Sequence, residues 1–135
     1  MADLIITAAS VLAGAGANVK HGTAGAAITA GQVVYREAAT ATYKLADNDA
    51  ATALHSAVGI ALHASLSGQP LAVLSDGPIT IGAALTAGTA YYLSSTPGAI
   101  CPAADLGIGD EPVLIGLATS ASVLSVAIRE TNVTL

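Results

Sequence analysis

The chain has 135 residues, of which 10% are charged, and nine Asp or Glu against four Lys or Arg give a formal net charge of −5. This length corresponds to one domain with a core of ordinary size. Phosphate binding needs clustered Lys and Arg, so four scattered basic residues exclude a nucleic-acid partner. Soluble domains carry charge on about 25% of their residues. The small charged fraction favours a surface that partner subunits cover, and the alternative is a monomer with a neutral surface.

The first 25 residues predict an extended arm in front of the β domain. Leu4–Thr7 has a β-like apolar pattern, and the sequence after it is interrupted by Gly14, Gly16, Gly22 and Gly25. Ala and Gly bury too little apolar area to offset the entropy lost on ordering a backbone. We therefore expect this arm to lie along a neighbouring subunit.

Residues 26–135 predict one β domain made of two similar halves, about 26–76 and 77–135. The segment Ile28–Tyr35, ITAGQVVY, is similar to Leu85–Tyr92, LTAGTAYY. The triplet GIA that begins at Gly59 is likewise similar to the triplet GLA that begins at Gly116. Both pairs are 57 positions apart, and this shared offset indicates an internal duplication.

The repeated glycines predict matching turns and strand starts. We expect Gly31 and Gly88 to lie in equivalent turns, because glycine adopts a positive φ without strain. We expect Gly59 and Gly116 to open equivalent strands.

Apolar residues alternate with polar or small ones in three segments, Ala41–Leu45, Pro78–Ile81 and Leu124–Arg129, which is the period of a half-buried strand. Gly or Pro recurs at short intervals after residue 58, too often for a long helix. Ala46–Ala57 allows a short helix capped by Asp47 or Asn48. The fold class that follows is all-β, a compact barrel or sandwich.

Two long uncharged runs, residues 50–75 and 77–104, raise the question of a membrane. Both runs contain polar or turn-forming residues and have no basic flanks, so we expect strands and turns and no membrane partner. Leu4–Ala17 has the apolar character of a signal-peptide core, but Asp3 is the only charge before it. We therefore expect it to belong to the mature protein.

The sequence offers no recognisable catalytic motif. It has no Gly-x-Ser-x-Gly elbow and no signature around its single cysteine, Cys101. We expect Cys101 to fill an apolar strand position. The chain is therefore predicted not to be an enzyme, with no catalytic residues.

The candidate metal ligands do not have the spacing of a known site. His55 and His63 are eight positions apart, and His21 is distant from both. The run Asp47-Asn48-Asp49 lacks the glycine and the distal glutamate of an EF-hand loop. We expect hydrogen-bonded or exposed histidines near turns, an Asx turn at Asp47, and no metal or cofactor.

Sugar-binding platforms use exposed aromatic rings, and this chain has no Trp, no Phe and four Tyr. Tyr35 and Tyr92 occupy equivalent positions of the repeat, which suggests paired roles in the core. Carbohydrate binding is therefore a rival interpretation with little support.

Both halves contain short turn-and-strand motifs: GPITI at 77–81, YYLS at 91–94, PAADL at 102–106, VLIGLA at 113–118, GQVVY at 31–35, YKLAD at 43–47 and GQPLAVL at 68–74. Together these motifs resemble the head decoration, or capsid cement, proteins of tailed phages. The similarity covers roughly residues 25–130.

This resemblance implies a structural protein of the virion, made in the host cytoplasm, that sits on the outside of an assembled phage head. Its partner would be the major capsid protein, whose neighbouring subunits it clamps, and it would be a homo-oligomer, a trimer or a dimer. The alternative is a receptor- or glycan-binding β domain of a phage tail fibre.

Overall fold

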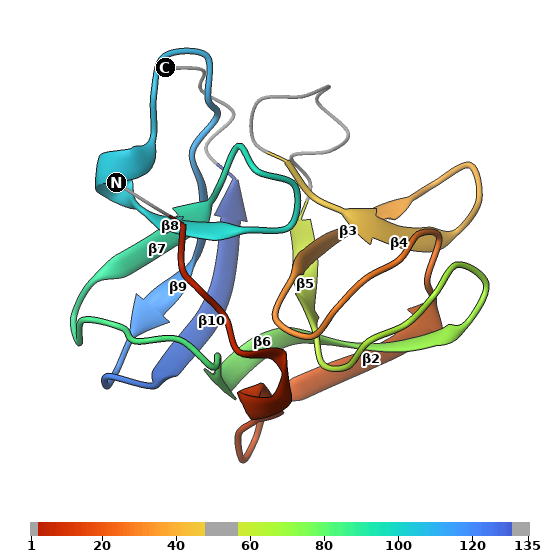
Figure 1. Ribbon diagram of the computed structural model, residues 1–135, viewed down its shortest axis with the longest axis horizontal. Helices are drawn as coiled ribbons and strands as arrows, with labels where there is room; N and C mark the ends of the chain where they lie inside the picture. The colour runs from red at the N-terminus through yellow and green to blue at the C-terminus, as the bar shows by residue number, and fades with distance from the viewer. Residues whose placement is uncertain (1–2, 48–56, 131–135) are drawn as a thin grey trace.

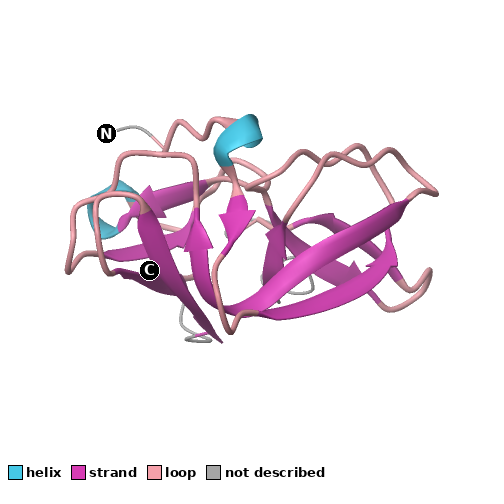
Figure 2. Cartoon of the chain, turned by 90° about the horizontal axis from the view of Figure 1, so that it is seen from below, coloured by secondary structure: helices cyan, strands magenta, loops and turns pink. Residues whose placement is uncertain are grey.

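The structure is a computed structural model that describes residues 3–47 and 57–130. The elements, in chain order, are η1 (Ala8–Ser10), β1 (Leu12–Ala13), β2 (Asn18–Thr23), β3 (Val33–Glu37), β4 (Thr42–Leu45), β5 (Ala57–Ala61), β6 (Pro70–Thr80), β7 (Ala90–Leu93), β8 (Ile100–Pro102), η3 (Ala103–Asp105), β9 (Val113–Ala118) and β10 (Val123–Glu130). The helical segments η1 and η3 are single 3-10 turns (Figure 2). The all-β prediction is confirmed.

The strands form one antiparallel sheet with the order β4-β3-β5-β6-β10-β9-β7-β8, and β1 and β2 also pair with β6. The sheet curls strongly, so it forms a half-barrel (Figure 1). Just after β2, Ala24 bridges Tyr43 of β4 and the Gly25 N–H donates to the Tyr43 carbonyl at 2.7 Å. The first half therefore curls round until β4 meets the end of β2.

The two halves repeat one pattern of strand pairing with the offset of 57. In the first half Val33 lies opposite Ile60 and Val34 opposite Gly59. The equivalent residues in the second half pair in the same way, Ala90 with Leu117 and Tyr91 with Gly116. Both ladders then shift register at the same step, and the β3–β4 and β7–β8 hairpins also share one register.

The connection that leads to the last strand differs in length between the two halves. Ala61 pairs with Val73, whereas Ala118 pairs with Leu124, so the second connection is six residues shorter and the offset falls to 51. Asp76 of β6 and Ala127 of β10 are 51 positions apart and lie directly opposite each other. This pair, with one residue from the last strand of each half, therefore lies at the centre of the arrangement of the two halves. The predicted boundary after residue 76 falls inside β6, which the two halves share.

The matching turns are confirmed. Gly31 has φ +89° and Gly88 has φ +83°, and their N–H groups donate to Ala61 and Ala118 at 2.8 and 2.7 Å. The other prediction needs a correction, because Gly59 and Gly116 lie inside β5 and β9 and do not open them. A Cβ on Gly116 would collide with the Ser125 carbonyl of β10, and one on Gly59 with Val73 and Leu74 of β6. Close approach of a neighbouring strand explains glycine at both positions.

Two hydrophobic clusters make up the core. The smaller one fills the interior of the first half with seven buried residues: Ala24, Ile28, Val34, Tyr43, Ala61, Leu71 and Val73. The larger one contains the interior of the second half, with Leu124 and Ile115, together with the opposite face of the first half, with Val33 and Ile60. The alternation is confirmed at Ile79 and Ile81 and at Leu124 and Val126, which are all buried. In Ala41–Leu45 the prediction holds for Tyr43 alone, because Ala41 is exposed at the hairpin turn and Leu45 is half-buried like its polar neighbours.

The N-terminal segment is not an arm separate from the β domain. β2 pairs with β6 over six residues, from Asn18 to Thr23, and β1 pairs with the far end of β6. Before β1, the N–H groups of Leu4 and Thr7 donate to Ile100 and Gly82 at 2.8 Å. The backbone groups of this glycine-rich segment are hydrogen-bonded to strands of its own domain. Composition does not reveal such pairing, so the expectation of a separate arm is wrong.

The short helix allowed over Ala46–Ala57 falls mostly outside the described residues, apart from Ala46, Asp47 and Ala57. Within the described ranges, no helix has the length and apolar character that a membrane span requires.

Candidate functional site

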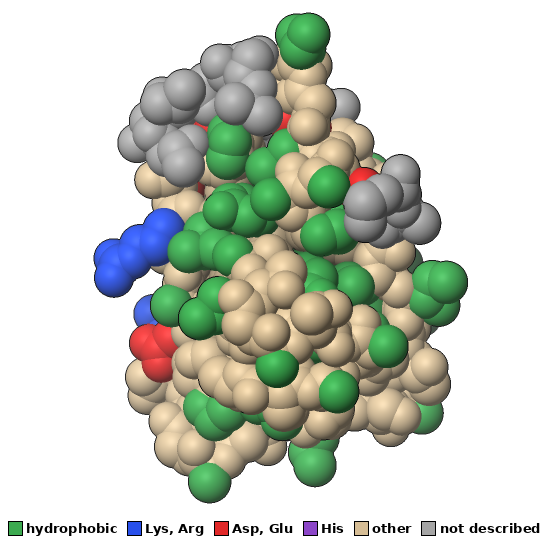
Figure 3. Space-filling view, turned by 90° about the vertical axis from the view of Figure 1, so that its left-hand side faces the viewer, with side chains coloured by type: hydrophobic (Ala, Val, Ile, Leu, Met, Phe, Trp, Pro, Cys, Tyr) green, Lys and Arg blue, Asp and Glu red, His purple; other side chains and the backbone are tan. Residues whose placement is uncertain are grey.

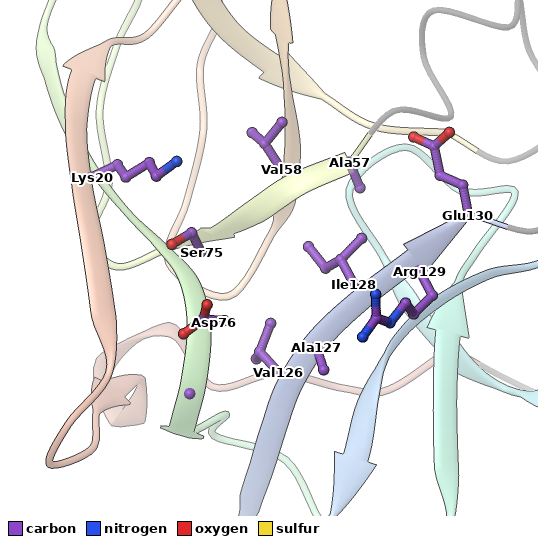
Figure 4. A pocket seen from close by; sticks show the side chains of 11 residues that line it. Lys20, Ala57, Val58, Ser75, Asp76, Val126, Ala127, Ile128, Arg129 and Glu130 are labelled. Carbon is purple, nitrogen blue, oxygen red and sulfur yellow. The ribbon is translucent and has the colours of Figure 1, made fainter.

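A hollow of about 820 Å³ lies where β5 and β10 diverge from β6 (Figure 4). β6 forms its floor with Ser75, Asp76 and Gly77, beside the pair on which the two halves are centred. The other lining residues are Lys20 of β2, Ala57 and Val58 of β5, and Val126, Ala127, Ile128, Arg129 and Glu130 of β10. The hollow is open to solvent and mixes apolar side chains with charges of both signs.

Two polar side chains of this hollow are hydrogen-bonded to Asn18 of β2. The Ser75 hydroxyl donates to the Asn18 carbonyl at 3.2 Å, and the Asp76 carboxylate accepts from the Asn18 amide at 2.6 Å. No histidine or cysteine is among the lining residues, and the Ser75 proton is donated to a backbone carbonyl and not to a basic side chain.

A second cluster joins the N-terminus to β8, where ligand atoms of Asp3, Cys101 and Asp105 all lie within 4.8 Å of one another. It is the one such group found among residues 3–47 and 57–130. One Asp3 oxygen accepts from the Ser94 hydroxyl at 2.6 Å. This cluster could not be predicted from the sequence, because Asp3 and Cys101 meet only once the N-terminal segment has paired with Ile100.

The cysteine of this cluster is a protonated thiol at neutral pH. Cys101 is 1% exposed, as expected for an apolar strand position. Burial raises the pKa of the Cys101 thiol from 9.0 to about 12, and the carboxylates of Asp3, Asp105 and Asp110 add to the shift. Because thiolates are the nucleophiles and the metal ligands of cysteine chemistry, this environment suits neither role.

The histidine and Asx candidates are spread over the fold. His63 uses both ring nitrogens, with Nδ1 2.9 Å from the Ala64 carbonyl and Nε2 accepting from the Ala72 N–H at 3.0 Å. His21 is exposed on β2. Asp47 lies just after β4, and His55 lies outside the described residues. His63 is therefore a structural histidine beside a turn.

The paired core role expected for Tyr35 and Tyr92 is half right. The two residues are equivalent in register, but Tyr35 is buried whereas Tyr92 is half-exposed. The neighbouring Tyr91 is buried instead, and its hydroxyl accepts from the Thr86 N–H at 3.0 Å. The difference arises because the face that carries Tyr35 is covered, and the equivalent face with Tyr92 is open.

This open face contains a row of uncharged side chains that crosses four strands, and we call it the outer row. Leu117 of β9, 48% exposed, lies opposite Ala90 of β7 and Ser125 of β10, and Ser125 lies opposite Pro78 of β6. Directly opposed residues of an antiparallel pair project from the same face. The outer row is therefore a neutral strip on a rigid sheet.

Large apolar side chains are exposed elsewhere on the described surface. Besides Leu117 they are Ile5, Leu12, Val19, Val58, Leu66 and Ile108, and Ile108 is 99% exposed. Figure 3 shows one face on which hydrophobic side chains gather and charged ones are few. A face on which apolar side chains gather is typical of a surface that binds another protein.

Comparison with known proteins found no matching family model and no similar curated protein.

Proposed function

We propose that this chain is a decoration protein of a phage head, which binds the outside of the assembled shell and stabilises contacts between major capsid subunits. The observation that carries the proposal is the surface: 10% charged residues overall, with seven large apolar side chains exposed among the described residues. When a protein partner replaces water on such a surface, the free-energy cost is small because few charged groups have to be desolvated.

The chemistry of the described residues supports the same proposal. The one cysteine is a buried thiol, the Ser75 hydroxyl in the hollow donates to a backbone carbonyl, and His63 is engaged through both nitrogens. A paired β-sheet holds exposed side chains in fixed positions. Such a surface is suited to recognising another rigid surface.

The mechanism we propose is linkage. A protein that binds the assembled shell and not its dissociated subunits adds its binding free energy to the stability of the shell. A standard interface buries about 1,600 Å². Repeated sites on a symmetric shell, together with oligomerisation of the decoration protein, would add avidity.

The test is co-sedimentation with heads of the phage that encodes the chain, prepared without this protein. We expect saturable binding to assembled heads and none to dissociated capsid subunits. The tail-fibre alternative predicts the reverse, with binding to host cells or to surface glycans and none to heads. The open hollow at the centre of the sheet is where such a ligand would bind, although no aromatic side chain lines it.

A further inference from the structure

The strand β2 lies at an edge of the sheet (Figure 1). One side of it pairs with β6. On the other side, no strand of the described ranges pairs with Asn18–His21, and the nearest bridge comes just after β2, between Ala24 and Tyr43 of β4. The residues from Asn18 to His21 are all exposed. An edge of this kind presents unpaired N–H and C=O groups to which another strand can add.

The pairing with β6 shows which backbone groups of β2 point outward. Ala24, directly after β2, donates its N–H to a carbonyl of the segment before β6 at 2.9 Å. Backbone groups of an antiparallel strand point alternately to its two sides, so Thr23, His21 and Val19 point away from β6. Pro70 lies opposite Thr23 and has no N–H to donate, which agrees with this assignment. The one register shift inserts its extra residue into β6, so the alternation along β2 is unbroken.

The charges beside this edge restrict what can add to it. The side chains of Lys20 and Asp76 lie on one face of the sheet, where both line the hollow (Figure 4). Asp76 accepts a hydrogen bond from the Asn18 amide at 2.6 Å. The ion pair found among the described residues lies elsewhere, between Lys44 and Glu37. A lysine on an edge strand opposes the addition of another strand, unless that strand brings an opposite charge beside it.

We infer that this edge binds a second copy of the chain, by antiparallel pairing of β2 with β2 about a two-fold axis at Val19. In this register Val19 of one copy pairs with Val19 of the other, and Lys20 lies opposite Asn18. Neighbouring strands are about 4.8 Å apart, so the long stem of Lys20 can bring its ammonium to the Asp76 carboxylate that Asn18 of the other copy binds. The two-fold axis forms this ion pair twice. On the opposite face the two Val19 side chains, each 38% exposed in one copy, become neighbours.

The charge pattern is what identifies a second copy as the occupant and selects the register. Moving the axis to Lys20 would place the two lysines directly opposite each other, which is destabilising. Moving it to His21 would take Lys20 away from Asp76 and bring the ladder up to the bridge between Ala24 and Tyr43. The axis at Val19 avoids both problems. A two-fold contact uses the same surface on both copies, so it closes as a dimer.

Charge substitutions test the inference on the full chain, with light scattering over a wide range of concentrations. Lys20→Glu and Asp76→Lys each put like charges side by side twice in the dimer, so each should weaken association by about tenfold or more. The double variant restores opposite charges and should associate as the wild type does. Arg36→Glu is the matched control, since it makes the same change of charge at an exposed position on β3. Thermal unfolding checks that every variant stays folded.

The backbone pairing is tested separately. His21→Pro removes an N–H that points away from β6, which an edge strand tolerates, so this variant should fold and stay monomeric. In the wild type, hydrogen exchange of the Val19 amide should be slow at concentrations where the dimer forms and fast after dilution. This measurement needs no substitution, so it tests the inference even if a variant fails to fold.

Several results would overturn the inference. They are a monomeric wild type, a double variant that associates as weakly as the single ones, and a control that loses association to the same extent as Lys20→Glu. An oligomer whose Val19 amide exchanges freely would place the contact elsewhere. A Lys20→Glu chain that keeps its oligomer and loses only head binding would assign the edge to the capsid protein. The inference does not depend on capsid binding, so a wild-type dimer that fails to bind heads would count against the proposed function alone.

Discussion

Ala41 stands in the first half where Gly98 stands in the second, and both residues have a left-handed backbone. Their φ angles are +56° and +77°, and each lies in the turn of a hairpin with the same register. Ala41 is the one non-glycine residue with positive φ in the described ranges. The duplicated fold therefore imposes a conformation on alanine that L-residues adopt at a cost of about 1–2 kcal/mol.

The first prediction is that Ala41→Gly stabilises the domain. Relief of the left-handed strain outweighs the greater entropy of glycine in the unfolded chain, which is about 0.4–1 kcal/mol, so we expect a gain of about 0.5–1 kcal/mol. Gly98→Ala should do the opposite and cost about 2 kcal/mol or more, because it adds strain and its Cβ would lie 2.9 Å from Leu45. Urea unfolding measures both effects. A destabilised Ala41→Gly variant would show that this turn is not built like its equivalent.

The second prediction concerns the glycines inside β5 and β9. Gly59→Ala and Gly116→Ala should each destabilise the domain by about 1–3 kcal/mol, because the added methyl group meets the neighbouring strand. Gly107→Ala is the matched control, since nothing lies within 4 Å of its Cβ position and its φ is not positive. Similar losses at both positions in urea unfolding would support the duplication. A loss at only one of them would count against it.

Much of this fold is visible in the sequence because the duplication repeats short-range signals. The turns at Gly31 and Gly88 follow from a motif that occurs twice, and the alternating segments indicate which side chains are buried. The prediction that Gly59 and Gly116 open their strands is wrong. Glycine is needed there because a neighbouring strand comes close, and this approach depends on the register and leaves no pattern in the local sequence. The N-terminal strands were missed for a related reason, since β2 forms only by pairing with β6, whose residues lie about 50 positions away.

The candidate surfaces were harder to predict than the fold. The outer row is composed of Ala, Leu, Ser and Pro from four strands, and nothing in those residue types marks them as a surface. Only the comparison of equivalent positions in the two halves distinguishes Leu117 from the buried Ile60. The cluster of Asp3 with Cys101 likewise exists only through topology.

The third prediction is that Cys101 makes stability depend on pH in the alkaline range. Its pKa is raised to about 12 in the folded state, so the folded protein holds the thiol proton more tightly than the unfolded chain does. The stabilisation is complete below the ordinary value of 9.0 and is lost as the pH rises from there toward 12. Unfolding by urea over this range should show a fall that is shallower in Cys101→Ala. Equal slopes would contradict the buried thiol, as would rapid alkylation of the native protein at pH 8.

The fourth prediction concerns His63, whose ring accepts a hydrogen bond from the Ala72 N–H where a strand would offer a backbone carbonyl. The Leu62 N–H donates to the Ala72 carbonyl at 3.0 Å, and the Ala72 N–H donates to His63 Nε2. In His63→Ala the Ala72 N–H has lost this acceptor, so hydrogen exchange of the Ala72 amide should be faster than in the wild type. Unchanged protection of this amide in the variant would rule out the bond.

The most direct test of the proposed function is the thermal stability of phage heads. Heads of the encoding phage, prepared without this protein, would be heated with increasing amounts of the purified chain while DNA release or shell disassembly is recorded. The linkage account predicts that the disassembly temperature rises with concentration and reaches a plateau when a fixed number of copies per shell is bound. A disassembly temperature that does not change at saturating protein, or a rise without a plateau, would contradict a decoration role.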